Sequence, residues 1–154
     1  MRAVVQRVTR ASVTVDGMVT GSIAKGLVVL LGVAADDDDA DVEFMVRKLG
    51  SLRIFGDAEG RMNLSIRDAG GSFLVVSQFT LLGDVSGGNR PSFTGAASAA
   101  TADRLYEAVC AGLRGAGFEV QTGVFGAHMT VALDGDGPVT ILVDTSGRKL
   151  ARDH

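Results

Sequence analysis

The sequence over residues 73–82, which reads FLVVSQFTLL, constrains the fold more strongly than any other part of the chain. Its first four residues are apolar and glycines lie close to both ends, a pattern that predicts a strand buried on both faces. Ser77, Gln78 and Thr80 interrupt the run, and a buried polar side chain without a partner costs about 1–3 kcal/mol. Three explanations are open. These side chains bond to nearby backbone, or the strand ends at Val76 and an exposed turn follows, or the polar groups line a pocket where a ligand supplies the partners.

The composition predicts one globular domain over residues 1–154. Hydrophobic residues make up 46% of the chain and charged residues 21%, which suffices for a core. Cys110 is the only cysteine, so no internal disulfide can form, and we expect this residue in the core. The N-terminal segment lacks a signal-peptide pattern, and the longest apolar run, residues 27–35, is too short to span a bilayer. We therefore predict a cytoplasmic protein that does not enter a membrane.

The charge limits the partners. The net charge is −3 and the isoelectric point is about 5.3, whereas proteins that hold long duplex nucleic acid through many phosphates are normally basic. We expect no long duplex as a partner. A nucleic-acid contact would be small, for example from Arg90, Arg148 or Lys149 to a few phosphates.

The hydrophobic pattern predicts an α+β fold, in which a compact, antiparallel, barrel-like sheet packs against two main helices. The helices are expected over residues 36–50 and 101–114, and a polar tail over residues 146–154. The predicted strands cover residues 2–15, 18–23, 27–33, 52–55, 62–66, 73–82, 118–122, 129–133 and 139–143.

Four consecutive aspartates at residues 36–39 precede the first predicted helix. Carboxylates at a helix start complement the helix dipole, and one of them can cap the helix. A metal site is the alternative, but consecutive side chains at a helix start point in different directions. We therefore expect capping.

Few side chains suit conventional hydrolysis. His128 and His154 are the only histidines, so a Ser-His-Asp triad would need His128, and no metal-binding Cys/His spacing occurs. The glycine-rich loop at residues 83–94 contains Arg90 and either holds a phosphate or is an ordinary surface loop. Gly137-Pro138 is either a plain turn or, with a cis bond, a rigid backbone wall beside a ligand.

Four segments, in this order and spacing, resemble the D-aminoacyl-tRNA deacylase family, the D-tyrosyl-tRNA deacylases. They read SQFTL at residues 77–81, RPSF at 90–93, GVFGA at 123–127 and DGPVT at 136–140. The opening MRAVVQRVTRASV is also similar to the start of that family. The similarity extends from Met1 to about Asp144.

The resemblance implies a homodimer of β-barrel-like subunits that acts on tRNA without a cofactor or metal ion. The expected reaction is hydrolysis of the ester between a D-amino acid and the 3′-terminal adenosine of tRNA. It releases free tRNA and the D-amino acid, and so proofreads chirality in translation. Glycine mischarged on tRNA-Ala is an expected further substrate.

The resemblance also implies catalytic residues. Ser77, Gln78 and Phe79 are expected at the reacting ester, where main-chain N–H groups at Phe79 and nearby stabilise the oxyanion. The ribose 2′-hydroxyl of the tRNA is expected to assist. Thr80 is a candidate nucleophile, but no general base is evident beside it, so we favour a positioning or structural role.

Further residues are implied in substrate binding. The family pattern places Phe125, Gly126, Ala127 and Met129 at the terminal adenine, which can stack on an aromatic or thioether surface. His128 departs from this pattern, because the family often has an acidic residue there, and the details of adenine binding depend on it.

The resemblance gives Gly137-Pro138 the role of a chiral filter. The bond is expected to be cis and to enter the partner subunit's site, where its carbonyl groups would exclude the side chain of an L-amino acid. Arg7 is expected to brace this loop. Gly135 stands where the family usually has Asn, and this departure affects the expected stiffness of the loop rather than the reaction.

Three other functions compete with this interpretation. One is a non-catalytic nucleic-acid-binding protein, which the low positive charge disfavours. Another is a small-molecule hydrolase or isomerase built at a subunit interface, which would need more titratable groups. The third is a purely structural dimer, which would leave Ser77, Gln78 and Thr80 without a function.

Overall fold

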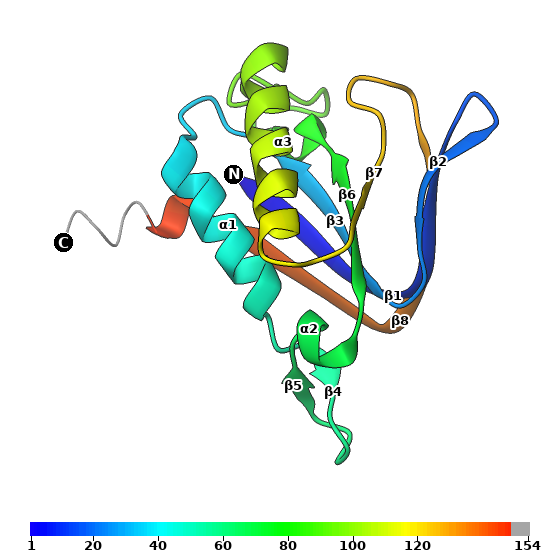
Figure 1. Cartoon of the computed structure of the whole chain (residues 1–154). Coiled ribbons are helices and arrows are strands. Elements are labelled where there is room, and N and C mark those ends of the chain that lie inside the picture. Colours follow the sequence, from blue (N-terminus) through cyan, green and yellow to red (C-terminus); the bar gives the residue numbers. More distant parts are fainter. Residues whose placement is uncertain (149–154) are drawn as a thin grey trace.

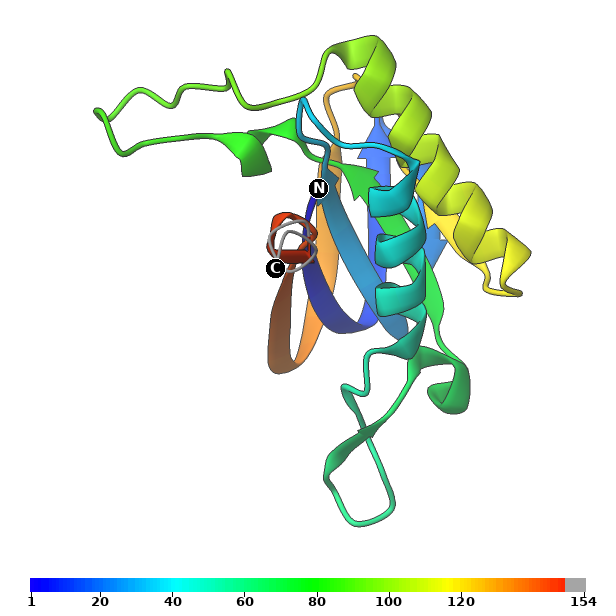
Figure 2. The same ribbon diagram turned by 90° about the vertical axis from the view of Figure 1, so that its left-hand side faces the viewer.

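The computed structural model describes residues 1–148, in which a curved sheet is covered on one side by two helices (Figures 1 and 2). The elements in chain order are β1 (Arg2–Val15), β2 (Met18–Ile23), β3 (Gly26–Gly32), α1 (Asp39–Ser51), β4 (Phe55–Gly56), β5 (Met62–Leu64), α2 (Ile66–Ala69), β6 (Ser72–Ser77), the 3₁₀ helix η1 (Phe79–Leu82), α3 (Ala99–Gly115), β7 (Val120–Thr122) and β8 (Thr130–Asp144).

The sheet is organised around β1, which hydrogen-bonds to three strands. The first half of β1 pairs with β3, its second half pairs with β2, and β8 pairs with it from end to end, all antiparallel. From β2 the sheet continues through β1, β3 and β6 to β7. Its two ends approach each other closely, because a Cβ atom on Gly21 of β2 would lie 2.4 Å from the carbonyl oxygen of Thr122 in β7. The sheet is therefore nearly closed into a barrel.

The predicted fold class is confirmed, with α1 and α3 as the two main helices. The expected antiparallel pairing is wrong at two places, because β6 runs parallel to both β3 and β7. Helix α1 lies in the connection between β3 and β6, and α3 lies between β6 and β7. A crossover through a helix returns the chain to the edge from which it started, so the next strand runs in the same direction.

The aspartate run caps α1, as expected. The Asp38 side chain accepts hydrogen bonds from the N–H groups of Ala40 and Asp41, and the Asp41 carboxylate accepts from the Asp38 N–H. Asp37 has a different role, because its buried carboxylate lies 2.7 Å from the amino group of Met1. Asp37 therefore connects the segment before α1 to Met1, the residue that precedes β1, and Asp38 caps α1.

Three predicted strands end differently in the structure. The buried strand at 73–82 stops at Ser77, and η1 follows it. The strand expected at 52–55 is reduced to β4, Phe55–Gly56. The strand expected at 62–66 ends at Leu64, because Ser65 forms a capping box with Asp68 and begins the short helix α2.

The two strands expected at 129–133 and 139–143 form one strand, β8. Its pairing with β1 is interrupted between Gln6, which pairs with Thr140, and Val8, which pairs with Gly135. One residue of β1 therefore lies opposite the four residues 136–139, and β8 bulges there. The predicted polar tail covers residues 146–154, of which residues 149–154 lie outside the described residues. In the described part, the Arg148 N–H donates to the Thr145 carbonyl at 3.2 Å.

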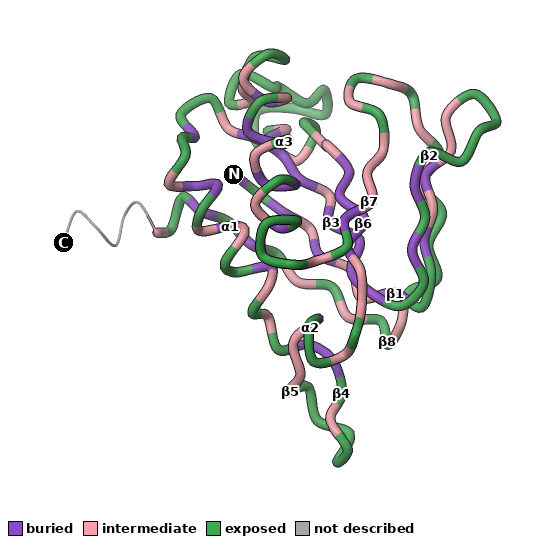
Figure 3. The backbone as a smooth tube through the Cα atoms, in the orientation of Figure 1, coloured by how far each residue is buried: buried purple, intermediate pink, exposed green. Residues whose placement is uncertain are grey.

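Strand β6 is buried on both faces, as predicted. Phe73 and Val75 pack in the cluster between the sheet and the helices, whereas Leu74 and Val76 pack in a second cluster inside the barrel. Figure 3 shows buried stretches along β1, β3 and β6. Within residues 1–148, no helix is long and apolar enough to cross a membrane.

Candidate active site

A cavity of about 550 Å³ opens where β6 ends. Three segments line it: residues 76–79 from the end of β6 into η1, residues 125–131 in and before β8, and residues 97–102 at the start of α3. These segments meet at the top of the molecule in Figure 1. The polar interruption in the β6 sequence thus has two of the three explanations offered by the sequence. The strand ends, and Ser77 and Gln78 line a pocket.

The chain passes closely over β3 as it leaves β6. The Gln78 N–H donates to the Leu31 carbonyl at 2.8 Å. A Cβ atom on Gly32 would lie 2.9 Å from the Gln78 carbonyl oxygen, 3.1 Å from the Leu81 Cβ and 2.7 Å from a Leu82 methyl group. Only glycine at this position lets η1 lie against the sheet.

The start of η1 presents backbone donors beside the cavity. The N–H groups of Phe79 and Thr80 have no helical partner because they precede the first turn, and no acceptor among residues 1–148 bonds to them. The first N–H group of η1 that forms a hydrogen bond is that of Leu81, which donates to the Gln78 carbonyl at 3.3 Å. The predicted donor at Phe79 is therefore unpaired at the edge of the cavity.

Thr80 does not line the cavity. Its side chain is exposed, and its hydroxyl accepts a hydrogen bond from the Gln78 side-chain amide. No carboxylate or histidine of the described chain hydrogen-bonds to this hydroxyl. The contact links Thr80 to a residue that does line the cavity, which agrees with a positioning role.

The segment expected to hold adenine lines the opposite wall, with Phe125, Gly126, Ala127 and Met129 all at the cavity. Gly126 has a φ of +78°, a left-handed conformation that glycine adopts without strain, and it completes the turn before β8. The Phe125 ring lies 6.2 Å from the ring of Tyr106, centroid to centroid. The Tyr106 hydroxyl donates to the buried Val75 carbonyl at 2.8 Å, so α3 and β6 support this wall.

The sequence reasoning missed the third wall. Ala97, Ala99 and Ala102 line the cavity at the start of α3. The signal was present, because residues 95–100 read GAASAA, a run of small side chains at a helix start. Small residues there leave room for a ligand.

The cavity offers little acid–base chemistry from side chains. Among the described residues that line it, His128 is the one titratable group. Cys110 lies in the core, as expected, where burial raises the pKa of its thiol to about 11. Residues 1–148 contain no group of three His, Cys, Asp or Glu side chains placed to hold a metal ion.

Gly137 and Pro138 do not line this cavity. They lie in the bulge of β8, and Figure 2 shows this strand bending at the end of the sheet that is far from the start of α3. Both residues are exposed, their peptide bond is cis, and Gly137 has a φ of +122°. One chain therefore holds the cavity and the Gly-Pro bulge at opposite ends of the sheet.

Arg7, which the resemblance expects to brace this loop, contacts the bulge. Its Nε donates to the Asp136 carbonyl at 3.1 Å and lies 3.3 Å from the Asp136 carboxylate. Its Nη1 donates to the Ile54 carbonyl at 2.7 Å. Gly135, the departure from the family pattern, is exposed at the edge of the bulge, and a Cβ atom there would lie 3.4 Å from the Gln6 side-chain nitrogen.

The glycine-rich loop forms an arm that projects from η1 to α3 (Figure 2). The arm places Arg90 in solvent, and its Phe93 ring contacts the Phe79 ring edge-on at 5.1 Å between centroids. Arg148, a predicted phosphate contact, is instead mostly buried beside Asp41 and over the Phe44 ring. Lys149 lies outside the described residues.

Comparisons with known proteins agree with this geometry. The model of the family described as D-Tyr-tRNA(Tyr) deacylase matches residues 4–144. A D-aminoacyl-tRNA deacylase of Anaeromyxobacter dehalogenans is 60% identical over 145 residues, 94% of this chain and 97% of the relative. One of Deinococcus radiodurans is 56% identical over 144 residues, 94% of this chain and 99% of the relative.

Two solved structures share the fold. The structure of the c-Myc DNA Unwinding Element Binding Protein matches with a TM-score of 0.89 at 42% identity, over 94% of this chain and 98% of that one. A structure described as a probable eukaryotic D-amino acid tRNA deacylase matches with a TM-score of 0.80 at 20% identity, over 93% of this chain and 98% of that one, and supports the fold alone.

Fold, site and relatives together define a hydrolase of the class that acts on aminoacyl-tRNA. The chain belongs to the D-Tyr-tRNA(Tyr) deacylase family, whose curated members quoted above are named D-aminoacyl-tRNA deacylase. The resemblance found in the sequence is thereby confirmed.

We expect Gly32→Ala to move η1 away from β3, because its methyl group would collide with backbone and Cβ atoms of residues 78–82. The free energy of unfolding should fall by about 1–3 kcal/mol, and the deacylation rate constant should fall at least about tenfold because the Phe79 N–H is displaced. Urea unfolding and single-turnover deacylation measure the two effects.

Gly115→Ala is the matched control, because a Cβ atom at Gly115 meets no other atom within 4 Å. It should leave the deacylation rate unchanged. A Gly32→Ala enzyme that is as active as the Gly115→Ala enzyme would show that the position of η1 is not critical.

Proposed function

We propose that this protein hydrolyses the ester between a D-amino acid and the 3′-terminal adenosine of tRNA, and that a second copy of the chain completes each site. The adenosine would lie against residues 125–129, with the ester carbonyl at the start of η1. Water would attack the carbonyl carbon, and the ester oxygen would leave as the 3′-hydroxyl of the ribose. We expect the enzyme to act in the cytoplasm, where it would meet aminoacylated tRNA.

The unpaired N–H groups of Phe79 and Thr80 are the observation on which this proposal chiefly rests. A tetrahedral intermediate places negative charge on the former carbonyl oxygen, and fixed N–H donors in an apolar cavity stabilise such an oxyanion strongly. Phe79 lines the cavity, Thr80 follows it in the chain, and the cavity lining holds hardly any side-chain base. The ribose 2′-hydroxyl of the substrate would therefore assist the attack, in place of a catalytic side chain.

The distance between the bulge and the cavity within one chain supports a two-chain site. Gly137 and Pro138 stand exposed on the bulge, where they can enter a neighbouring molecule. Large apolar side chains are exposed on the same strand, with Leu142 77% and Leu133 42% accessible. Leu142 is the more exposed of the two, and a large exposed apolar side chain on the strand that carries the bulge is consistent with an interface. We infer that β8 contributes to a homodimer interface.

The bulge would act as the chiral filter. In a dimer, the backbone of Gly137 and Pro138 would occupy the space that the side chain of an L-amino acid requires, while a D side chain would point away from it. Glycine has no side chain to exclude, so glycine mischarged on tRNA-Ala would be accepted too. Arg7, anchored at the Ile54 carbonyl, would keep the bulge in the required position.

The second candidate function is binding to DNA, since one similar structure is that of a protein named for binding a DNA unwinding element. The charge of this chain is the argument against it. A net charge of −3 gives no electrostatic attraction to a duplex, whereas contacts with the acceptor end of a tRNA require only a few cations, of which exposed Arg90 is one.

A paired deacylation assay tests the proposal. Purified protein is mixed, without added metal, with tRNA charged with D-tyrosine, with L-tyrosine, or, for tRNA-Ala, with glycine. We expect rapid loss of the D-tyrosyl and glycyl esters, and an L-tyrosyl rate at least about 100-fold lower. Equal loss of the D and L esters would refute the filter, and loss of neither from folded protein would refute the reaction.

We expect a dimer in solution, with a mass twice the 15.9 kDa of the chain. Leu142→Lys should give monomers and abolish deacylation, because a charge in an apolar interface is costly. Val19→Lys is the control, since Val19 is 63% exposed on β2 and lies outside the proposed interface. Light scattering after gel filtration measures the masses. A monomeric wild-type enzyme with full activity would contradict the two-chain site.

We expect Thr80→Ala to retain deacylation within about threefold of the wild-type rate. The hydroxyl lies outside the cavity and its hydrogen-bond partner is an amide rather than a base, so it cannot be activated as a nucleophile. Single-turnover rates with D-tyrosyl-tRNA measure the effect. Complete loss of activity with an unchanged unfolding midpoint would make Thr80 catalytic.

A further inference from the structure

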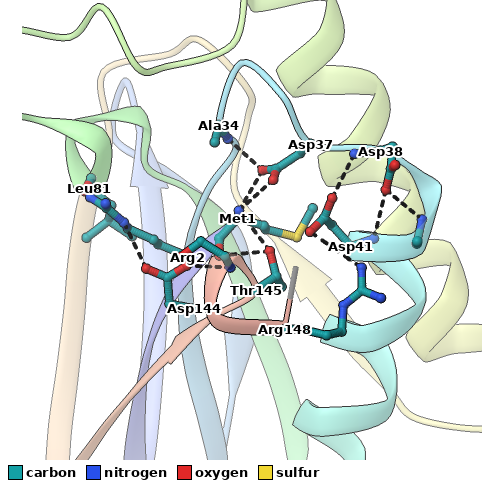
Figure 4. Close-up of polar contacts among 12 residues, drawn as sticks. Met1, Arg2, Ala34, Asp37, Asp38, Asp41, Leu81, Asp144, Thr145 and Arg148 are labelled. Atoms are coloured by element: carbon teal, nitrogen blue, oxygen red, sulfur yellow. Dashed lines mark hydrogen bonds and ion pairs between the residues drawn. The ribbon is translucent and has the colours of Figure 1, made fainter. Parts of the chain in front are cut away.

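A polar cluster outside the cavity connects the start of β1 with η1 (Figure 4). The Arg2 guanidinium donates through Nη1 to the Leu81 carbonyl at 3.1 Å and through Nε to the Asp144 carboxylate at 3.2 Å. Arg2 therefore contacts Leu81, the last residue of the SQFTL segment, which follows the unpaired N–H groups of Phe79 and Thr80 in the chain. Neither the sequence motifs nor the cavity lining pointed to this residue.

The Leu81 carbonyl needs such a partner. The turns of η1 use the carbonyls of Gln78 and Thr80, which accept from the N–H groups of Leu81 and Gly83. The carbonyl of Leu81 lies beyond these turns, where a helix end leaves acceptors without helical donors. A cation at a helix C-terminus satisfies them. Arg2 thus holds the end of η1, while the Gln78 N–H, bonded to β3 at 2.8 Å, holds its start.

The direction of the Arg2 side chain is itself determined by the sheet. Arg2 and Asp144 are directly paired residues of β1 and β8. Partial burial acts to raise the pKa of Asp144, but hydrogen bonds from Ser146 and the Arg2 guanidinium outweigh it and hold that pKa below the usual value. Asp144 is therefore charged at neutral pH and keeps the guanidinium directed toward Leu81.

The backbone beside Arg2 is fixed as well. The neighbouring Met1 amino group lies 2.7 Å from Asp37 and donates to the Thr145 hydroxyl at 3.0 Å, and these groups are buried (Figure 4). Thr145 follows Asp144 in the chain, and its N–H donates to the Met1 carbonyl at 3.0 Å. Arg2 thus extends from a rigid base.

The ion pair of Arg2 and Asp144 is exposed, so we expect it to influence the position of η1 more than the free energy of unfolding. The side chains of Arg2 and Asp144 are 49% and 42% accessible, and ion pairs this exposed contribute little to the free energy of unfolding. A small displacement of a catalytic donor, by contrast, is costly for the rate. Loss of Arg2 should therefore be seen in catalysis and not in unfolding.

We propose that Arg2 is a positioning residue for deacylation, which holds η1 so that the Phe79 N–H stays directed at the reacting ester. This inference rests on the function proposed above. Arg2 lines no part of the cavity and acts through the Leu81 carbonyl. Its loss should lower kcat and leave the affinity for tRNA largely unchanged.

The experiment compares Arg2→Ala and Arg2→Lys with Arg104→Ala. Arg104 forms an exposed ion pair with Asp39 between α3 and α1, at 3.5 Å, and serves as the matched control. We expect Arg2→Ala to lower kcat for D-tyrosyl-tRNA about tenfold, with KM within about twofold and an unchanged melting temperature. Arg2→Lys should recover part of the rate, because one ammonium cannot reproduce both bonds of the guanidinium fork.

Hydrogen exchange gives a readout that needs no activity. Amides of the peptide over residues 78–84 should exchange faster in Arg2→Ala than in wild type, and at the wild-type rate in Arg104→Ala. Equal exchange in all three proteins would overturn the inference even if the wild-type enzyme proved inactive on D-tyrosyl-tRNA.

Other outcomes also decide against it. A rise in KM that depends on salt would make Arg2 a phosphate contact, and a lower melting temperature would make it a structural residue. A kcat equal to that of Arg104→Ala would refute the inference while leaving the proposed reaction intact.

Discussion

The pairing of β1 with three other strands positions the two parts of the proposed two-chain site. Its first half is bonded to β3, which supports η1, and β8 is bonded to β1 on both sides of the bulge. Arg2 at the start of β1 reaches the Leu81 carbonyl, and Arg7, five residues later, holds the bulge that contains Gly137 and Pro138. One strand thus supports both the backbone donors of the cavity and the bulge proposed to serve a second cavity.

The proposed chemistry depends on backbone geometry rather than on side chains. The Phe79 and Thr80 N–H groups, the exposed Gly137–Pro138 backbone and the alanines at the start of α3 are its main features. Backbone groups can be placed accurately only when the surrounding packing is tight. The close approach of Gly32 to residues 78–82, and the two bonds that hold the ends of η1, meet that requirement. In the proposed mechanism, the ribose 2′-hydroxyl of the substrate assists the attack in place of a side chain.

The local rules of the sequence predicted much of this structure. Apolar spacing located α1 and α3, the aspartate run predicted the cap at Asp38, and the glycine-bordered apolar run predicted the doubly buried β6. The same rules failed where a long-range contact outweighed a local preference. Phe79, Leu81 and Leu82 read as strand, but Gln78 makes the last backbone bond to β3, and the chain then turns into η1 over Gly32.

The sequence by itself determined the fold class and the family, because periodicity and motif spacing can be read along the chain. It also named half of the residues that line the cavity. The tertiary structure alone decided the parallel pairing of β6, the alanine wall at the start of α3 and the place of Arg2. These features join residues far apart in the chain, and Arg2 and Leu81 meet only because the sheet brings them together. The tertiary structure also decided that the Gly-Pro bulge lies away from the cavity. The order of the motifs in the sequence does not specify this separation, because it follows from how the strands pair.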